Sequence, residues 1–247
     1  MDKTTRFSGR AGIYGQFRPS YPSELMTYLK TKCNAGEGFT IADIGSGTGK
    51  WTGQFFSWGC PIFAVEPNAD MRLKAEESFR GHEKVRSLEG TAEATGLPDN
   101  SVNLITAAQA FHWFDYAPTY NEFRRIARDE CHYAIVWNDR ISKGDPFSES
   151  YEKVLFDYCP EYANSRHRSP LEGYDSLFGG VPELKAYEYS QPLDLDGLKG
   201  RCFSSSYVPM ERESEINAEL ESVFIRYQNS GRVQMKYVTR LAFGEIK

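Results

Sequence analysis

Short apolar runs alternate with helix-like segments through the first half of the chain. Five runs are bounded by turn residues and predict strands: 39–44, 61–65, 85–88, 102–108 and 133–137. Helical spacing is predicted over 21–33, 48–58, 68–79 and 117–128, and Asn68 is the expected N-cap of the third helix. Strands that alternate with helices over short turns are typical of a doubly wound α/β fold with a parallel, Rossmann-like sheet.

The alternation breaks after residue 137. Residues 139–182 combine a helical stretch at 147–158 with a polar, glycine-rich loop, which predicts an insertion over one edge of the sheet. Strands at 184–190 and 233–243 and helices at 194–203 and 213–227 complete the chain, and the two strands are expected to form a hairpin-like edge. With no linker or internal repeat, we expect a single domain over 1–247. Its expected parts are an N-terminal arm and first helix (1–35), a cofactor-binding core (36–138), a cap insertion (139–185) and C-terminal edge strands and helices (186–247).

Composition excludes several classes of protein. Hydrophobic residues make up 40% and charged residues 26%, as in globular proteins. The net charge of −5 disfavours a general nucleic-acid binder. Neither a secretory signal nor an apolar run long enough to span a bilayer is present, so we expect a cytoplasmic protein without a membrane partner. The cysteines are odd in number and lack zinc-ligand spacing, so we expect free, mostly buried thiols and no metal site.

A glycine-rich loop joins the first predicted strand to the following helix. Residues Asp43 to Gly49 place glycines at 45, 47 and 49, where the backbone can turn sharply and approach a ligand closely. Glu66 ends the second predicted strand, 21 residues beyond Gly45, where a carboxylate accepts hydrogen bonds from a ribose diol. These two features fit a dinucleotide and other nucleosides alike.

Asp43 distinguishes between these ligands. An acidic residue two positions before the first glycine would repel a pyrophosphate but attract a cationic amino-acid head. Position 50 is Lys50, so the third glycine of the dinucleotide fingerprint is missing. S-adenosylmethionine (SAM) carries an ammonium group and no phosphate. The loop therefore favours a methyl-donor site over a nicotinamide or flavin site.

Four ordered motifs carry a family resemblance: residues 43–49, 65–68, 90–98 (with Gly90–Glu93 and Leu97–Pro98) and 108–114. With them the chain resembles a class I SAM-dependent methyltransferase of the methyltransferase type 11 group. Residues 14–22 and 205–209 extend the resemblance to the trans-aconitate methyltransferase-like subgroup. The resemblance implies a seven-stranded sheet of order 3-2-1-4-5-7-6 with strand 7 antiparallel.

The resemblance also implies where the cofactor, SAM, would bind. The methionine part is expected to face Asp43 and the loop, the ribose to face Glu66 beside Pro67, and the adenine edge to face residues 91–93. Thr91 stands where many relatives carry Asp, which leaves the backbone of Ala92 for the adenine contact. The N-terminal arm is expected over the cofactor. The expected cofactor-binding residues are Asp43, Gly45, Ser46, Gly47, Thr48, Gly49, Glu66, Pro67, Thr91, Ala92, Glu93, Gln109, Ala110, Tyr14 and Arg18.

The segment after the fourth strand is expected at the methyl-transfer end, because the carboxyl ends of such strands border the ligand crevice. His112 is the candidate general base, and the alternative is that it orients the loop. A carboxylate needs no base, since alignment with the donor supplies most of the rate. Aromatic side chains are expected around the methyl group, and a basic cluster at 166–168 would capture an acidic substrate or remain a solvated loop. The expected substrate contacts are Tyr21, Trp113, Phe114, Tyr207 and Arg168.

These observations predict SAM-dependent methyl transfer to a small molecule, with a carboxylic acid as the candidate acceptor. The alternative is a regulatory or scaffold protein that binds the cofactor without turnover. A nucleic-acid methyltransferase is disfavoured, because the chain has Gln-Ala-Phe-His at 109–112 where many amino-directed enzymes carry an Asn/Asp-Pro-Pro-aromatic tetrapeptide.

Overall fold

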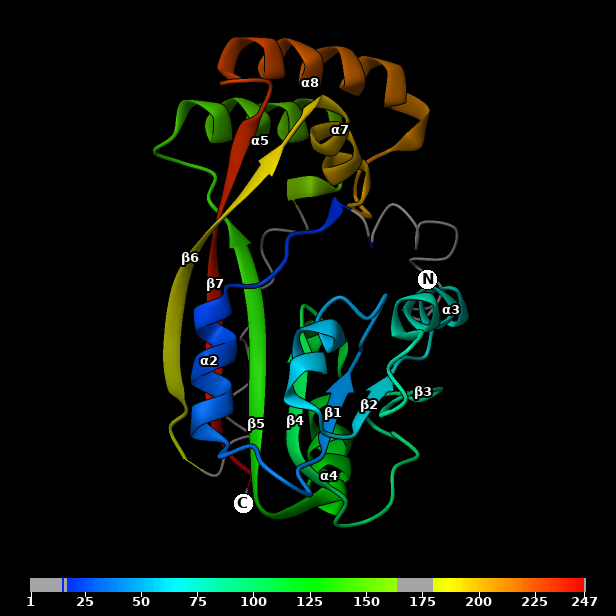
Figure 1. Ribbon diagram of the computed structural model, residues 1–247. Coiled ribbons are helices and arrows are strands. Elements are labelled where there is room, and N and C mark those ends of the chain that lie inside the picture. Colours follow the sequence, from blue (N-terminus) through cyan, green and yellow to red (C-terminus); the bar gives the residue numbers. More distant parts are fainter. Residues whose placement is uncertain (1–14, 16, 164–179, 247) are drawn as a thin grey trace.

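A seven-stranded sheet forms the centre of the computed structural model, which describes residues 15, 17–163 and 180–246 (Figure 1). The strand order is β3-β2-β1-β4-β5-β7-β6. The first five strands run parallel: β1 (Ile41–Ile44), β2 (Ile62–Val65), β3 (Val85–Leu88), β4 (Val102–Ala108) and β5 (Ala127–Arg140). Strand β7 (Val233–Glu245) is antiparallel to both β5 and β6 (Glu183–Leu193). The predicted fold class and strand order are confirmed.

Helices cover both faces of this sheet: α2 (Ser23–Lys32), the 3₁₀ helix η1 (Thr52–Trp58), α3 (Ala69–Phe79) and α4 (Tyr116–Ile126). Helix α3 begins as predicted, because the Asn68 side chain accepts a hydrogen bond from the Met71 N–H at 3.0 Å. The helix predicted over 48–58 is wrong in type: turns precede a 3₁₀ helix that begins at Thr52. Gly49, with φ of 78°, lies in the left-handed region and interrupts regular helix there.

The alternation of side chains along the central strands divides the core between the two faces. All four residues of β1 are buried, as expected for a parallel strand covered on both sides. Ile41 packs with Leu25 and Leu29 of α2, whereas its neighbour Ala42 packs with Phe123 of α4. Strand β1 is therefore packed between helix α2 on one face of the sheet and helix α4 on the other.

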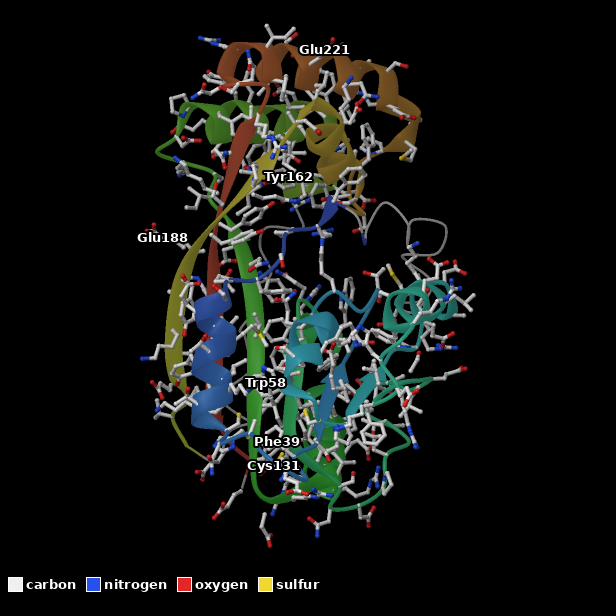
Figure 2. All side chains as sticks on the ribbon, in the orientation of Figure 1. Phe39, Trp58, Cys131, Tyr162, Glu188 and Glu221 are labelled. Atoms are coloured by element: carbon white, nitrogen blue, oxygen red, sulfur yellow. The ribbon has the colours of Figure 1, made fainter. Side chains whose placement is uncertain are left out.

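A helical cap lies beyond the carboxyl ends of β1 and β2 (Figure 1). It consists of α5 (Pro146–Tyr158), α7 (Leu195–Phe203) and α8 (Glu213–Tyr227), which share one hydrophobic core. Residues of β6 and β7 beyond Arg140 of β5 pair only with each other and continue into this cap. The cap is therefore built from two predicted parts of the chain: α5 belongs to the insertion, and α7 and α8 belong to the C-terminal segment. Figure 2 shows Tyr162 in the cap and Phe39 and Trp58 at the opposite end of the sheet.

All five cysteines are free and buried, as predicted: Cys33, Cys60, Cys131, Cys159 and Cys202. Within the described ranges, no three His, Cys, Asp or Glu side chains are grouped so that they could hold a metal ion. In the same part of the chain, no helix has the length and apolar character needed to cross a membrane.

Candidate active site

The glycine loop follows β1 at the point where the strand order reverses, since β2 and β4 pair with opposite edges of β1. Gly45, Gly47 and Gly49 all have positive φ, at 70°, 57° and 78°. The Gly45 N–H donates to the Val65 carbonyl at 2.8 Å, which ties the loop to the end of β2. A Cβ on Gly45 would lie 2.5 Å from the Cβ of Ala110, so this turn requires glycine for its conformation and for its packing.

Glu66 lies at the end of β2, beside this loop. Its Oε2 accepts from the Gly47 N–H and its Oε1 from the Asn68 N–H, both at 2.9 Å. Burial raises the pKa of this carboxyl, while the two backbone donors oppose that shift. The carboxylate therefore holds the loop through the Gly47 N–H and has further lone pairs that can accept from a hydroxyl group.

Asp43 is fully buried in β1, two residues before the loop. Its Oδ2 accepts from the Thr52 hydroxyl at 2.6 Å, whereas its Oδ1 has no hydrogen-bond partner among the described residues. Burial raises the pKa of Asp43 to about 7, the Thr52 hydrogen bond opposes this, and the charge of Glu66 adds to it. A buried carboxylate oxygen without a donor is a binding position for a cation or an N–H group.

Arg18 and Pro19, the described part of the N-terminal arm that lies next to the loop, line a pocket together with it. Lys50 Nζ donates to the Arg18 carbonyl, and Arg18 Nη2 donates to the Ser204 carbonyl at 3.0 Å, so the arm bridges the core and the cap. Burial, followed by the charges of Arg18 and Arg201, lowers the pKa of Lys50 to about 8. The residues that line this pocket are Arg18, Pro19, Tyr21, Gly45, Ser46, Gly47, Thr48, Lys50, Trp51, Ala108, Gln109, Asn138, Arg201 and Tyr237.

The segment after β4 closes one side of this pocket. Gln109 has a φ of 60°, an uncommon conformation for a residue other than glycine, and its N–H donates to the Val136 carbonyl at 3.0 Å. A short 3₁₀ helix, η2 (Phe111–Trp113), follows and carries His112. The His112 ring lies 4.4 Å from the Trp113 ring and 5.1 Å from the Trp137 ring, measured between centroids. An imidazole between two indoles can orient the loop as well as exchange a proton.

Three comparisons with known proteins bear on this pocket. Residues 42–135 match a family model described as Methyltransferase domain. Over 240 residues the chain is 34% identical to an uncharacterized methyltransferase of Mycobacterium bovis, and the alignment covers 96% of this chain and 94% of that protein. The chain belongs to the methyltransferase domain family.

Two further likenesses cover most of this methyltransferase. It is 27% identical over 197 residues to a Saccharomyces cerevisiae protein named "Probable S-adenosylmethionine-dependent methyltransferase CRG1", covering 72% of this chain and 67% of that one. It also matches a solved structure from Anaeromyxobacter dehalogenans, inferred to be a type II methyltransferase, with a TM-score of 0.65 and 25% identity. That match covers 93% of this chain and 98% of the other, so the family likeness includes the cap as well as the sheet.

The structure of the methyltransferase brings many of the sequence-predicted residues together. Arg18, Tyr21, Gln109 and the loop residues 45–48 line the pocket, with Asp43 and Glu66 next to the loop. Other predicted site residues are not in the lining set: Gly49, Pro67, Thr91–Glu93, Ala110, His112, Trp113, Phe114 and Tyr207. Glu93 Oε1 instead accepts from the N–H of Asp115, the N-cap of α4, at 2.8 Å. Tyr14 and Arg168 lie outside the described residues.

Several lining residues were not predicted from the sequence: Lys50, Trp51, Asn138, Arg201 and Tyr237. Lys50 and Trp51 directly follow the glycine loop, so their position next to it was a usable signal. Arg201 and Tyr237 come from α7 and β7, and no local motif marks them. Their contribution depends on how the cap folds over the sheet.

Proposed function

We propose that this methyltransferase transfers a methyl group from SAM to a small molecule, and that the methylated group is a carboxylic acid. The observation that carries the cofactor assignment is the buried Oδ1 of Asp43 beside a loop of three glycines with positive φ. That oxygen can accept from an ammonium group, and the loop admits a ligand to the backbone. The name of the yeast relative, an S-adenosylmethionine-dependent methyltransferase, supports the same cofactor.

The cofactor assignment follows the elements of the core. Asp43 and the loop residues 45–49 would hold the amino-acid end of SAM, Glu66 the ribose, and residues 91–93 the adenine edge. Arg18 from the arm, which lines the pocket, would face the cofactor carboxylate. Further cofactor contacts are proposed for Pro67, Gln109, Ala110 and Tyr14.

The acceptor assignment rests on charge and on the finer family likeness. The pocket lining includes Arg18, Lys50 and Arg201, which attract an anion. Residues 14–22 and 205–209 resemble the trans-aconitate methyltransferase-like subgroup, whose acceptors are carboxylic acids. When bound, SAM supplies an electrophilic methyl group. The protein then has to orient the acceptor carboxylate and exclude water, and Tyr21 and Trp51, whose rings meet edge to face at 4.5 Å between centroids, form one wall for this purpose.

Calorimetric titration with S-adenosylhomocysteine (SAH), with NAD in parallel, tests the cofactor assignment. We expect micromolar SAH binding and no NAD binding. Incubation with SAM and a panel of small carboxylic acids, followed by mass spectrometry for a gain of one methyl group, then tests turnover. NAD binding without SAH binding would refute the methyl-donor site. SAH binding without any methylated product would favour the alternative, a cofactor-binding regulatory or scaffold protein.

His112 tests the chemical class of the acceptor. A carboxylate is already ionised at neutral pH, so we expect His112→Gln to lower kcat by less than about tenfold and to leave the pH profile of kcat/KM unchanged in shape. Loss of a general base costs about 10²- to 10⁴-fold and removes a limb of that profile. A loss of that size would instead indicate a hydroxyl or amine acceptor.

A further inference from the structure

Arg201 is a buried cation that has no carboxylate partner among the described residues. Only 6% of the residue is exposed, and it projects from α7 to line the pocket. Its Nε donates to the Tyr237 hydroxyl at 2.9 Å, and its Nη1 donates to the Ser205 hydroxyl at 3.1 Å. These hydroxyl partners carry no charge. Within residues 15, 17–163 and 180–246, Arg201 forms no ion pair.

A second arginine of the cap shows the usual arrangement. Arg140 lies under the cap at the end of β5, and its Nη2 forms an ion pair with the Glu152 carboxylate and donates to the Tyr162 hydroxyl at 2.7 Å. The cap thus neutralises one buried guanidinium and leaves the charge of the other uncompensated. Burying an unpaired charge destabilises the folded state. A pocket-lining residue whose buried charge has no opposite charge beside it among the described residues is a candidate for binding an anion.

The surroundings of Arg201 add positive charge. Arg18 and Lys50 line the same pocket, and none of the described residues that line it is acidic. Burial lowers the pKa of Lys50 to about 8, and the charges of Arg18 and Arg201 add to this shift. Three cations that repel one another would be stabilised together by one or more bound anions.

Two anions are available to these cations: the carboxylate at the amino-acid end of the cofactor and an anionic group of the acceptor. Arg18 belongs to the arm and Lys50 directly follows the glycine loop, and the arm and the loop are the elements proposed to hold the cofactor. Arg201 comes from the cap, which lies across from the end of β1 (Figure 1). Of the three cations, Arg201 is therefore the one that comes from the cap and not from the elements proposed to hold the cofactor.

We propose that Arg201 binds an anionic group of the acceptor and so determines that this methyltransferase selects acids over their uncharged analogues. This inference rests on the proposed function, because it needs a cofactor in the loop. The side chain is held in place for this role: the Tyr237 hydroxyl that accepts from Arg201 donates in turn to Gln191 Oε1 at 3.3 Å. A guanidinium oriented in this way matches the planar, bidentate geometry of a carboxylate.

The test measures binding without turnover. Wild-type protein saturated with SAH is titrated by calorimetry with benzoate and succinate, and with benzamide and succinamide as uncharged counterparts. We expect at least one acid to bind and its amide not to bind. Arg201→Gln is expected to weaken binding of that acid by at least about tenfold, as for loss of a charge-assisted hydrogen bond. The SAH Kd is expected to change by less than about twofold.

Two further variants make the result decisive. Arg201→Lys keeps the charge but not the bidentate geometry, and it replaces Arg201→Gln if that variant does not fold; we expect it to weaken acid binding by a smaller factor. Arg212→Gln, a cap arginine paired with Glu215 on the surface, is the matched control and should bind the acids like wild type.

The outcomes separate this inference from the proposed function. If neither acid binds the wild-type complex, or if acids bind the Arg201 variants as well as wild type, the role of Arg201 is refuted while SAH binding stands. If Arg201→Gln weakens SAH to the same extent as the acid, Arg201 serves the cofactor carboxylate instead. If wild type does not bind SAH, the proposed function itself fails.

Discussion

Asp43→Asn is expected to weaken SAH binding by about 10- to 100-fold at pH 8, the largest effect that we predict on cofactor affinity. In the proposed assignment the lost interaction is a hydrogen bond between the ligand ammonium and a buried carboxylate, and such charged hydrogen bonds contribute about 1.5–3 kcal/mol. Asparagine keeps the size of the side chain and an acceptor for the Thr52 hydroxyl. Calorimetry on the two proteins at matched pH measures the difference.

The same substitution is expected to stabilise the free protein. Burial raises the pKa of Asp43 to about 7, whereas an unfolded Asp titrates near ~3.9. Between those values the folded state holds a proton that the unfolded state has released. The stability due to this carboxyl is therefore complete below about pH 4 and is lost as the pH rises through 7. Removing the ionisable group should raise the free energy of unfolding by about 1–3 kcal/mol at pH 8, with little change at pH 4, as measured by urea denaturation.

The pH dependence of binding provides the check on this argument. For wild type, SAH affinity should rise by up to about tenfold between pH 6 and pH 8, because the ionised carboxylate is the form that binds the ammonium. For Asp43→Asn, this rise should disappear. Asp99→Asn, which alters an exposed carboxylate paired with Arg125, is the control and should retain the wild-type profile. An unchanged profile in Asp43→Asn would mean that Asp43 does not contact the ligand.

The sequence predicts the bounds of those strands that are set by the local pattern of apolar and turn residues. The bounds of β3 and β4 match the predicted ranges. Strand β4 is a nearly continuous apolar run inside the sheet, whereas β3 is a partly buried edge strand that follows a turn. The strand predicted at 133–137 is much longer in the structure, where β5 spans Ala127–Arg140. The residues added at its C-terminal end, 138–140, are polar and only partly buried, and they are strand because β7 pairs with them as far as Arg140↔Tyr237. That pairing joins residues far apart in sequence, so no local pattern reveals it.

The candidate site likewise has a part that the local sequence predicts and a part that it does not. The core contribution is local, because Asp43, the glycines and Glu66 lie at strand ends whose order the sequence predicts. The cap contribution is not local: Arg201 reaches the pocket only because α7 packs on α8 and follows β6 out of the sheet. A cation in helix α7 looks like any solvated residue until its burial and its partners are known. The sequence therefore predicts the cofactor class more directly than the acceptor.

Gly45→Ala is expected to have the largest effect on the loop itself. A non-glycine residue at positive φ costs about 1–2 kcal/mol, and overpacking costs about 1–3 kcal/mol more. At Gly45 both terms apply, because φ is 70° and the new Cβ would lie 2.5 Å from the Cβ of Ala110. We expect a loss of about 2–5 kcal/mol in the free energy of unfolding, together with weaker SAH binding, since the loop and the segment after β4 must separate.

Gly47→Ala is the matched control, because it changes the same loop by the same atom. Its φ of 57° carries the backbone penalty, but no atom of the described residues beyond its chain neighbours lies within 4 Å of the added Cβ. We therefore expect a loss of about 1–2 kcal/mol from the backbone alone. The difference between the two variants in urea denaturation isolates the contact between the glycine loop and Ala110. Equal losses would show that this contact is relaxed in solution, so that the two loops bordering the pocket move independently.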